Sequence, residues 1–339
     1  METKIFNATT VDQAAALIKA GQLVAFPTET VYGLGADATN VAAVKQVYQA
    51  KGRPSDNPLI VHVADVETVE RFAKPLSVSA KKLIKAFWPG PLTMIFNLKP
   101  NALAPEVTGG LTTAAFRNPN NAATLALIRS AQTPIVGPSA NTSGKPSPTL
   151  AQHVLHDLDG KIAGILDDGA TQVGVESTVL DLSGTQPAIL RPGAVTAAQI
   201  EAVIGEPVLT EQHHVGATEV PKAPGMKYKH YAPAAQVYIV DHVKDWPAAL
   251  AWAAKQDVSV GVMATDDVFT TNQLPANCEQ FSLGEDVESA SRELFAGLRH
   301  FDTETEIKDI LCQAFDNTGL GAAYMNRLNK SAGQTHFSV

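Results

Sequence analysis

Strand-like and helix-like stretches alternate in two separate parts of this 339-residue chain. In the first part, short apolar runs such as residues 22–26 and 59–63 are separated by amphipathic stretches such as residues 41–50 and 122–131. Such alternation indicates an α/β architecture, which we expect to contain a mixed sheet. The last part, from about residue 236, repeats the alternation and predicts a smaller, open, doubly wound α/β unit.

A proline-containing segment without apolar periodicity separates the two parts. Residues 206–235 hold four prolines and the dense run APGMKYKHYAP. We therefore divide the chain into a first domain (residues 1–205), a linker (206–235) and a second domain (236–339). Flexible tethers are usually Gly/Ser-rich or Pro-rich, whereas this linker offers lysine and tyrosine side chains. We expect a lid over the active site, with a solvated spacer as the alternative.

Composition limits the partners of this protein. The net charge is −8 and the pI about 5.6, so the chain is a poor bulk ligand for nucleic acid, although a local basic site is compatible with it.

Cys278 and Cys312 form no CxxC pattern and are expected to be buried, reduced thiols. No secretory signal and no apolar stretch of about 20 residues is visible, so we expect a cytoplasmic protein without a membrane partner.

Four cations lie where predicted elements meet loops. Lys51 and Arg53 precede the rigid run PSDNP, Arg117 ends a predicted strand, and Arg191 precedes Pro-Gly. Each alone could be an ordinary surface or salt-bridge residue. Because ligand-binding residues concentrate on such loops, the four together predict a polyanion site within an acidic protein.

The polar loop PIVGPSANTSGKPSPT offers hydroxyl and amide groups from Ser139, Asn141 and Ser147. It looks like the end of a P-loop, but Pro146 occupies the position of the magnesium-ligating Ser/Thr. Either these groups bind phosphate from a different kind of loop, or the segment is a Ser/Thr-rich turn. No Ser-His-Asp, HExxH or catalytic carboxylate pair emerges. His62, on an apolar strand, is by itself more typical of a satisfied core histidine.

The second part has no GxGxxG after its first predicted strand, so we assign it no dinucleotide. Gly319-Leu320-Gly321 precedes a basic stretch and is compatible with the start of a helix.

Longer segments resemble those of a known family. FPTETVYGLG, KGRPSDNPLIVH, FWPGPLT, PSANTSGKPSPT, GVESTVLDL, LRPGAV and PGMKYKHYAP occur in this order and resemble the threonylcarbamoyl-AMP synthase family. The resemblance to a YrdC-like domain covers about residues 10–205, and the GLGAAYMNRLNK ending resembles the longer, two-domain members. It implies a YrdC-like domain with a mixed twisted sheet and a positively charged cavity, followed by a smaller Rossmann-like domain.

The resemblance also implies an activity. A nucleotidyltransferase of this family converts L-threonine, bicarbonate and ATP into threonylcarbamoyl-AMP and pyrophosphate. The product would pass to a tRNA threonylcarbamoyl transferase complex, which modifies the adenosine beside the anticodon; direct tRNA binding by this chain is not expected. Since few carboxylates line the motifs, Mg²⁺ is expected to be held mainly by the ATP phosphates and by no protein side chain.

The resemblance assigns the site residues individually. The residues expected to bind L-threonine are Thr28, His62, Arg117, Gly137 (through its backbone) and Ser177. The residues expected to bind ATP are Lys51, Ser55, Thr113, Ser139, Asn141, Ser147, Arg191 and Tyr231. Lys51 and Arg53 are expected to be catalytic.

Two other functions compete with this interpretation. An RNA-binding module would use the cationic residues to hold a nucleic-acid backbone, but the acidic charge and the lack of interleaved aromatics outside the linker oppose it. A carbamoyltransferase that uses carbamoyl phosphate would share the fold class. Release of pyrophosphate that requires both threonine and bicarbonate would separate the synthase from both alternatives.

Overall fold

All three residues of strand β2 (Val24–Phe26) are buried, and they pack alternately on the two faces of the sheet. Val24 and Phe26 pack in a cluster with α1 (Val11–Lys19) and α6 (Ala122–Ala131), whereas Ala25 joins a larger cluster with α2 (Val41–Lys51). Successive residues of a strand point to opposite faces, so the sheet carries helices on both. This computed structural model describes residues 2–55, 57–210, 221–222, 231–303 and 306–338.

The chain divides into two compact units. The first unit comprises residues 1–143, 148–172 and 176–228, and the second comprises residues 144–147, 173–175 and 229–339. Two short segments therefore belong to the second unit although their sequence neighbours belong to the first. The domain limits given above, at residues 205 and 235, stay a prediction. Most of the proposed lid, with Lys227, Lys229 and His230, lies outside the described residues.

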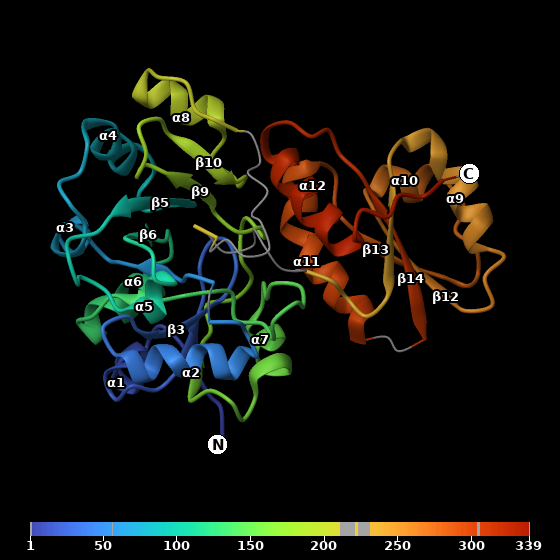
Figure 1. Ribbon diagram of the computed structural model, residues 1–339. Coiled ribbons are helices and arrows are strands. Elements are labelled where there is room, and N and C mark those ends of the chain that lie inside the picture. Colours follow the sequence, from blue (N-terminus) through green and yellow to red (C-terminus); the bar gives the residue numbers. More distant parts are fainter. Residues whose placement is uncertain (1, 56, 211–220, 223–230, 304–305, 339) are drawn as a thin grey trace. The chain divides into compact units, whose positions relative to one another are not determined.

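The first unit contains a ten-stranded mixed sheet in the order β1-β8-β2-β3-β7-β4-β6-β5-β9-β10; Figure 1 labels β5, β6, β9 and β10 within it. Its other strands are β1 (Lys4–Phe6), β3 (Gly33–Asp37), β4 (Ile60–His62), β5 (Leu92–Asn97), β6 (Thr113–Arg117), β7 (Ile135–Val136), β8 (Gly164–Leu166), β9 (Thr178–Asp181) and β10 (Ala188–Arg191). At its centre β4 is parallel to β6 and antiparallel to β7. The mixed α/β class predicted from the sequence is confirmed.

Helices cover this sheet, and most begin at a capping side chain. Asn40 accepts a hydrogen bond from the amide of Ala43 at the start of α2, and Asn121 caps α6 in the same way. Such caps satisfy amides that the helix leaves unpaired. The remaining helices of this unit are α3 (Val66–Phe72), α4 (Val78–Phe87), α5 (Pro105–Thr108), α7 (Ala151–Leu158) and α8 (Ala197–Ile204).

The second unit contains a four-stranded parallel sheet in the order β11-β14-β12-β13. Its strands are β11 (Gln236–Val240), β12 (Ser259–Ala264), β13 (Cys278–Ser282) and β14 (Ile307–Gln313). Its helical segments are η1 (Val243–Asp245), α9 (Trp246–Ala253), α10 (Asp266–Thr271), α11 (Val287–Thr303) and α12 (Gly319–Ala332). In Figure 1, α9 and α10 lie on one side of this sheet and α11 and α12 on the other. The expected small, open, doubly wound unit is therefore confirmed, and Gly319-Leu320-Gly321 starts helix α12.

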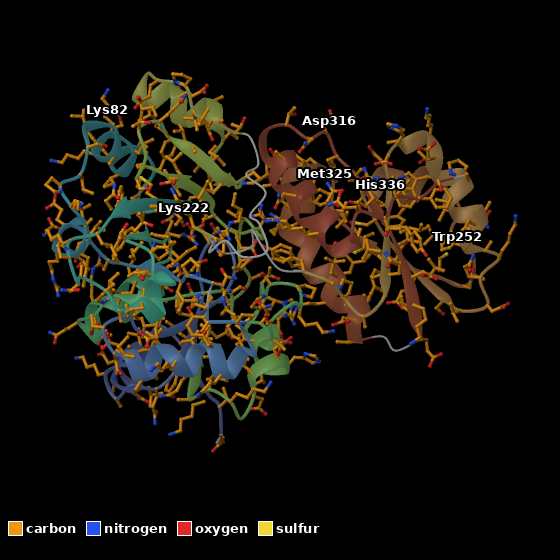
Figure 2. The ribbon with its side chains drawn as sticks, in the orientation of Figure 1. Lys82, Lys222, Trp252, Asp316, Met325 and His336 are labelled. Atoms are coloured by element: carbon orange, nitrogen blue, oxygen red, sulfur yellow. The ribbon has the colours of Figure 1, made fainter. Side chains whose placement is uncertain are left out.

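Aromatic rings cover the α9 face of this second sheet. The ring of Trp252 lies 5.3 Å from that of Tyr238 and 6.0 Å from that of Phe337 (Figure 2).

Both cysteines are free thiols; Cys312 is buried and Cys278 half-buried, and burial raises the pKa of Cys312 to about 12. Among the described residues, no helix is long and apolar enough to cross a membrane.

Candidate active site

The ends of two central strands bring His62 and Arg117 together. Parallel pairing of β4 with β6 sets these two residues opposite each other in register. The next strand, β7, ends one residue before Gly137, whose amide donates a hydrogen bond to the carbonyl oxygen of Ile60. Three residues expected to bind threonine therefore come from adjacent strands of one sheet, although 75 residues separate Gly137 from His62 in the sequence.

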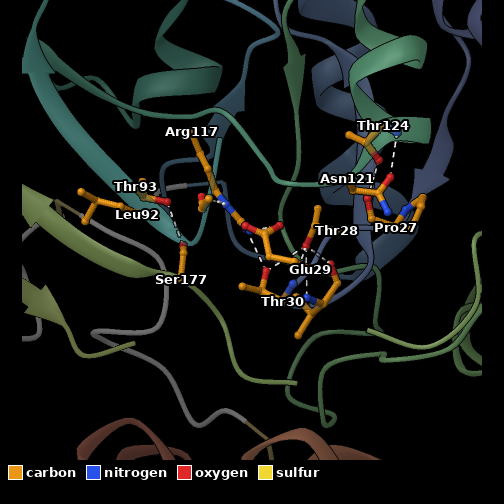
Figure 3. Close-up of polar contacts among 12 residues, drawn as sticks. Pro27, Thr28, Glu29, Thr30, Leu92, Thr93, Arg117, Asn121, Thr124 and Ser177 are labelled. Atoms are coloured by element: carbon orange, nitrogen blue, oxygen red, sulfur yellow. Dashed lines mark hydrogen bonds and ion pairs between the residues drawn. The ribbon is translucent and has the colours of Figure 1, made fainter. Parts of the chain in front are cut away.

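The Arg117 side chain is buried, with 4% of the residue exposed, and is held by acceptors on several segments. It donates from Nη1 to Thr30 Oγ1 at 2.8 Å and from Nε to the Gly90 carbonyl oxygen at 3.4 Å. Its Nη2 atom lies 2.7 Å from Oε2 of Glu29, an equally buried carboxylate (Figure 3). Arg117, one of the four cations from which we predicted a polyanion site, is thus part of a buried ion pair.

The turn after β2 carries the acceptors for Arg117. Thr28 Oγ1 donates to the carbonyl oxygen of Val31 at 2.7 Å and accepts from the amides of Thr30 and Val31. It also lies 2.8 Å from Thr30 Oγ1 (Figure 3). Hydroxyl side chains that bond their own backbone in this way fix a turn without regular secondary structure. Thr28 therefore orients the segment that meets Arg117.

His62 is neutral at physiological pH in this environment. The residue is 2% exposed, and burial, followed by the charge of Arg117, lowers the pKa of its imidazole to about 3. Among the described residues, its buried Nδ1 atom has no hydrogen-bond partner. The ring makes an edge contact with Phe26 at 5.2 Å between centroids. His62 is therefore not the satisfied core histidine that an apolar strand alone would suggest.

Gly137 lies where the neighbouring side chains leave no room for a Cβ atom. A Cβ atom at this position would lie 2.5 Å from Cζ of Phe26 and 2.7 Å from both Cε1 and Nδ1 of His62. Both distances are far below van der Waals contact. A glycine is thus required for the backbone to approach the imidazole so closely.

Ser177 and Arg191 form a second contact group in the first unit. Ser177 Oγ lies 2.8 Å from Thr93 Oγ1, and Arg191 donates from Nη2 to Ser177 Oγ at 3.2 Å. Arg191 also donates to the Ser177 carbonyl oxygen from Nε at 3.1 Å and from Nη2 at 3.0 Å. A residue expected to bind ATP therefore contacts one expected to bind threonine.

The FWPGPLT segment connects the two groups. Gly90 accepts from Arg117, and the carbonyl oxygen of the next residue, Pro91, accepts from the amide of Thr178 at 3.0 Å. Thr93, which meets Ser177, follows in strand β5. Figure 3 shows Arg117, Glu29 and Ser177 around this segment.

Lys51 forms the third group and corrects an expectation. We expected it on a polar loop, but it is the last residue of α2 and only 2% exposed. Its ammonium group donates to the main-chain oxygens of Ser139 and Asn141. The helix ends at Gly52, whose φ of 61° is left-handed, and this turn directs Arg53 toward the carbonyl oxygens of Asn57 and Pro58, each at 3.3 Å.

The remaining expected ATP residues are distributed over both units. Thr113 is the buried first residue of β6, and Ser55 is exposed. Ser147 and Tyr231 belong to the second unit, where both are buried. The ring of Tyr231 lies 5.1 Å from that of Phe295 on α11.

Sequence reasoning missed Glu29, Thr30 and Thr93. Glu29 stands inside the segment FPTETVYGLG, but a single carboxylate gives no paired-carboxylate pattern, and its partner lies 88 positions further along. The available signal was an acidic residue flanked by two threonines directly after an apolar strand. No group of three His, Cys, Asp or Glu side chains that could hold a metal occurs in the part of the chain that the structure describes.

Comparison with known proteins extends over the whole chain. A family model described as "Telomere recombination" matches residues 16–193, and one described as "Threonylcarbamoyl-AMP synthase, C-terminal domain" matches residues 195–333. The chain belongs to the threonylcarbamoyl-AMP synthase family. This result confirms the resemblance that the sequence segments indicated.

Individual members of the family agree with this assignment. A Bacillus subtilis protein named threonylcarbamoyl-AMP synthase is 49% identical over 96% of this chain and 94% of its own length. A Schizosaccharomyces pombe protein of the same name is 38% identical over 91% of this chain and 84% of its own. The crystal structure of Pyrococcus abyssi Sua5 complexed with L-threonine has a TM-score of 0.91 and 44% identity, over 99% of this chain and 100% of that one.

Proposed function

We propose that this protein is an L-threonylcarbamoyladenylate synthase, a nucleotidyltransferase that forms threonylcarbamoyl-AMP and pyrophosphate from L-threonine, bicarbonate and ATP. The observation that carries the proposal is similarity over both domains to relatives named for this activity. The L-threonine complex of the similar P. abyssi protein supports threonine as the amino-acid substrate. The RNA-binding alternative gains no support from these relatives.

The threonine pocket in this proposal consists of Thr28, His62, Arg117, Gly137 and Ser177. The buried guanidinium of Arg117 suits a carboxylate, because charge-assisted hydrogen bonds are strong where water is excluded. The neutral imidazole of His62 can bond a hydroxyl group without adding a charge. The backbone at Gly137 has no side chain to obstruct a small ligand beside that imidazole.

The ATP site in this proposal combines three buried or half-buried cations with polar loop groups. Lys51 and Arg53 are the proposed catalytic residues. The other proposed ATP contacts are Ser55, Thr113, Ser139, Asn141, Ser147, Arg191 and Tyr231. Lys51 supports the role because its ammonium group already organises the main chain at Ser139 and Asn141.

Two chemical steps lead from these substrates to the product. The threonine amine combines with bicarbonate, which releases water, or with carbon dioxide, which releases a proton, to give a carbamate. A carbamate oxygen then attacks the α-phosphorus of ATP in line, so that pyrophosphate leaves. Because the nucleophile is already anionic, the second step needs positioning and neutralisation of charge more than a strong base. Buried cations such as Arg191 and Lys51 would supply both.

Mg²⁺ is part of the proposal as a companion of ATP. Its ligands would be mainly oxygens of the triphosphate, because Mg²⁺ is usually bound through substrate phosphates. Bound there, it would neutralise charge on the departing pyrophosphate. We further propose that the protein acts in the cytoplasm and passes its labile product to a tRNA threonylcarbamoyl transferase complex.

Release of pyrophosphate tests the proposed function directly. The purified full-length chain is incubated with Mg·ATP, and pyrophosphate is measured with threonine, bicarbonate, both or neither. Release that requires both substrates is the expected result. Transfer from carbamoyl phosphate without threonine would instead identify a carbamoyltransferase, and salt-sensitive RNA retention without turnover would identify an RNA-binding protein.

A further inference from the structure

The carboxylate of Glu29 is a buried charge that the proposed reaction has not yet used. Glu29 is 6% exposed, and its Oε2 atom lies 2.7 Å from Nη2 of Arg117. Among the described residues, neither of its carboxylate oxygens has a hydrogen bond of good geometry. Figure 3 shows this carboxylate facing the guanidinium between the turn after β2 and strand β6.

The two charged partners differ in how well their polar atoms are satisfied. Arg117 donates hydrogen bonds to Thr30 and to the Gly90 carbonyl, in addition to its ion pair. Glu29 has the ion pair but no donor directed at its remaining lone pairs, although buried polar groups are normally hydrogen-bonded. A buried anion in this condition is suited to accept hydrogen bonds from a ligand. A carboxylate in this position would also favour a cationic donor.

A cation and an anion side by side match the charges of an α-amino acid. The carboxylate and the ammonium group of such a molecule are separated by a single carbon, so both can reach adjacent protein charges at once. We propose that Glu29 binds the α-ammonium group of the amino-acid substrate while Arg117 binds its carboxylate. This inference rests on the proposed function and assigns Glu29 the nitrogen that becomes the carbamate.

Neutralising Arg117 is the simpler role for Glu29, and it makes a different prediction. A carboxylate that only compensates a buried guanidinium contributes equally to ligands with and without an amine. A carboxylate that binds the ammonium group distinguishes them. His62 contributes no charge to the binding of either ligand, because its imidazole stays neutral. Selectivity for the amine therefore separates the two roles.

The test measures binding of two ligands to the full-length chain by calorimetry without ATP. L-threonine is compared with (R)-3-hydroxybutyrate, which keeps the carboxylate, the hydroxyl and the carbon skeleton but lacks the amine. We expect the wild-type chain to prefer threonine by roughly 10- to 100-fold, the effect of one hydrogen bond to a charged group. Glu29→Gln should lose most of this preference by weakening threonine, with the affinity for (R)-3-hydroxybutyrate unchanged or increased.

Two variants control this measurement. Glu29→Asp keeps the negative charge and should retain part of the preference. Glu106→Gln removes a carboxylate that pairs with the exposed Lys45 at 3.2 Å, and it should leave both affinities unchanged. Circular dichroism and thermal unfolding establish whether Glu29→Gln is folded. If it is not, the folded Glu29→Asp chain decides, since its shorter side chain should reduce the preference for threonine, and a full preference in that chain overturns the inference.

Each outcome bears on the inference. Equal affinity of the wild-type chain for the two ligands overturns it, as does a folded Glu29→Gln chain that keeps the full preference. If the wild-type chain binds no threonine and releases no pyrophosphate, the proposed function is refuted, and the proposed role of Glu29 is refuted with it. If pyrophosphate release depends on threonine but Glu29→Gln keeps the full preference for threonine over (R)-3-hydroxybutyrate, only the proposed role of Glu29 is refuted.

Discussion

The ammonium nitrogen of Lys51 lies 2.5 Å from the main-chain oxygen of Asn141, across 90 positions of sequence. The same ammonium group donates to the main-chain oxygen of Ser139, and the amide of Ser143 donates to the carbonyl oxygen of Lys51 at 2.9 Å. The two loops that attract attention in the sequence are therefore joined through one lysine at the end of α2. The ammonium group of Lys51 therefore holds the loop around Ser139 and Asn141 in place, in addition to any contact that it makes with a ligand.

Replacing Lys51 with alanine should cost both activity and stability. The variant loses a phosphate-directed cation, which by analogy with one oxyanion donor lowers turnover by about 10²- to 10³-fold. It also leaves the carbonyl oxygens of Ser139 and Asn141 without this donor, so unfolding free energy should fall by about 1.5–3 kcal/mol. Pyrophosphate release and urea unfolding measure the two effects. Lys45→Ala, an exposed lysine on the same helix, is the control. Near-normal turnover of the folded Lys51→Ala chain would remove Lys51 from the site.

Replacing Gly137 with alanine should disturb the threonine pocket through sterics alone. The new methyl group would overlap Phe26 and His62, so we expect a loss of about 1–3 kcal/mol in unfolding free energy and weaker threonine binding. Gly184→Ala is the matched control, since its nearest neighbouring atom would be 3.9 Å away. Calorimetry measures the affinity for threonine, and chemical unfolding measures the unfolding free energy. Unchanged affinity in Gly137→Ala would show that the ligand does not approach this backbone.

Local signals predicted the fold better than they predicted the site. Helix α6 spans the residues expected from periodicity, and Asn40 caps α2, because both features depend on neighbouring residues. Strand β3, with the sequence GLGAD, was missed because it lacks β-branched residues, and β13 was missed because CEQFS is polar. Their strand structure depends on pairing with neighbours elsewhere in the chain.

The contacts within the site join residues that are far apart in the sequence, so no local sequence pattern predicts them. The pair Glu29–Arg117 depends on the turn after β2 meeting the end of β6. The burial of Lys51 likewise depends on the loop at Ser139 folding over the end of α2. Family resemblance supplied the residue list, whereas the partners of each residue came from the structure.

The buried imidazole of His62 should make the fold sensitive to acid. Its pKa is about 3 in the folded chain against about 6.5 when unfolded, so the unfolded state binds a proton first as the pH falls. Above about pH 6.5 the imidazole is neutral in both states and has no effect. Below it, stability should fall by about 1.4 kcal/mol per pH unit until the folded form also takes a proton near pH 3.

Urea unfolding at several pH values between 7.5 and 4 tests this linkage. His62→Gln lacks the titrating group, so its stability should decline less steeply over this interval than that of the wild-type chain. His156→Gln removes an exposed histidine and should follow the wild-type slope. Parallel curves for the wild-type and His62→Gln chains would contradict a depressed pKa at His62.

Helix α11 holds the segment that contains Ser147, within the second unit. Arg299, 7% exposed, donates to the Pro146 carbonyl oxygen from Nε at 3.1 Å and from Nη2 at 2.6 Å. One turn further, Asp302 pairs with Lys145 at 2.8 Å and accepts from the amide of Ala234 at 2.5 Å. Removing Arg299 would leave the Pro146 carbonyl without this bidentate donor and free the segment beside Ser147.

We therefore expect Arg299→Ala to raise the KM for ATP more than that for threonine, because Ser147 is a proposed ATP contact. Arg299→Lys keeps the charge but cannot reproduce the two donors that converge on the Pro146 carbonyl oxygen, so it should restore activity only in part. Arg292→Ala, an exposed arginine on the same helix, should behave like the wild-type chain. Initial rates of pyrophosphate release at varied ATP and at varied threonine measure both constants. Equal increases in the two constants, or none, in a folded Arg299→Ala chain would show that α11 does not organise the ATP-binding loop.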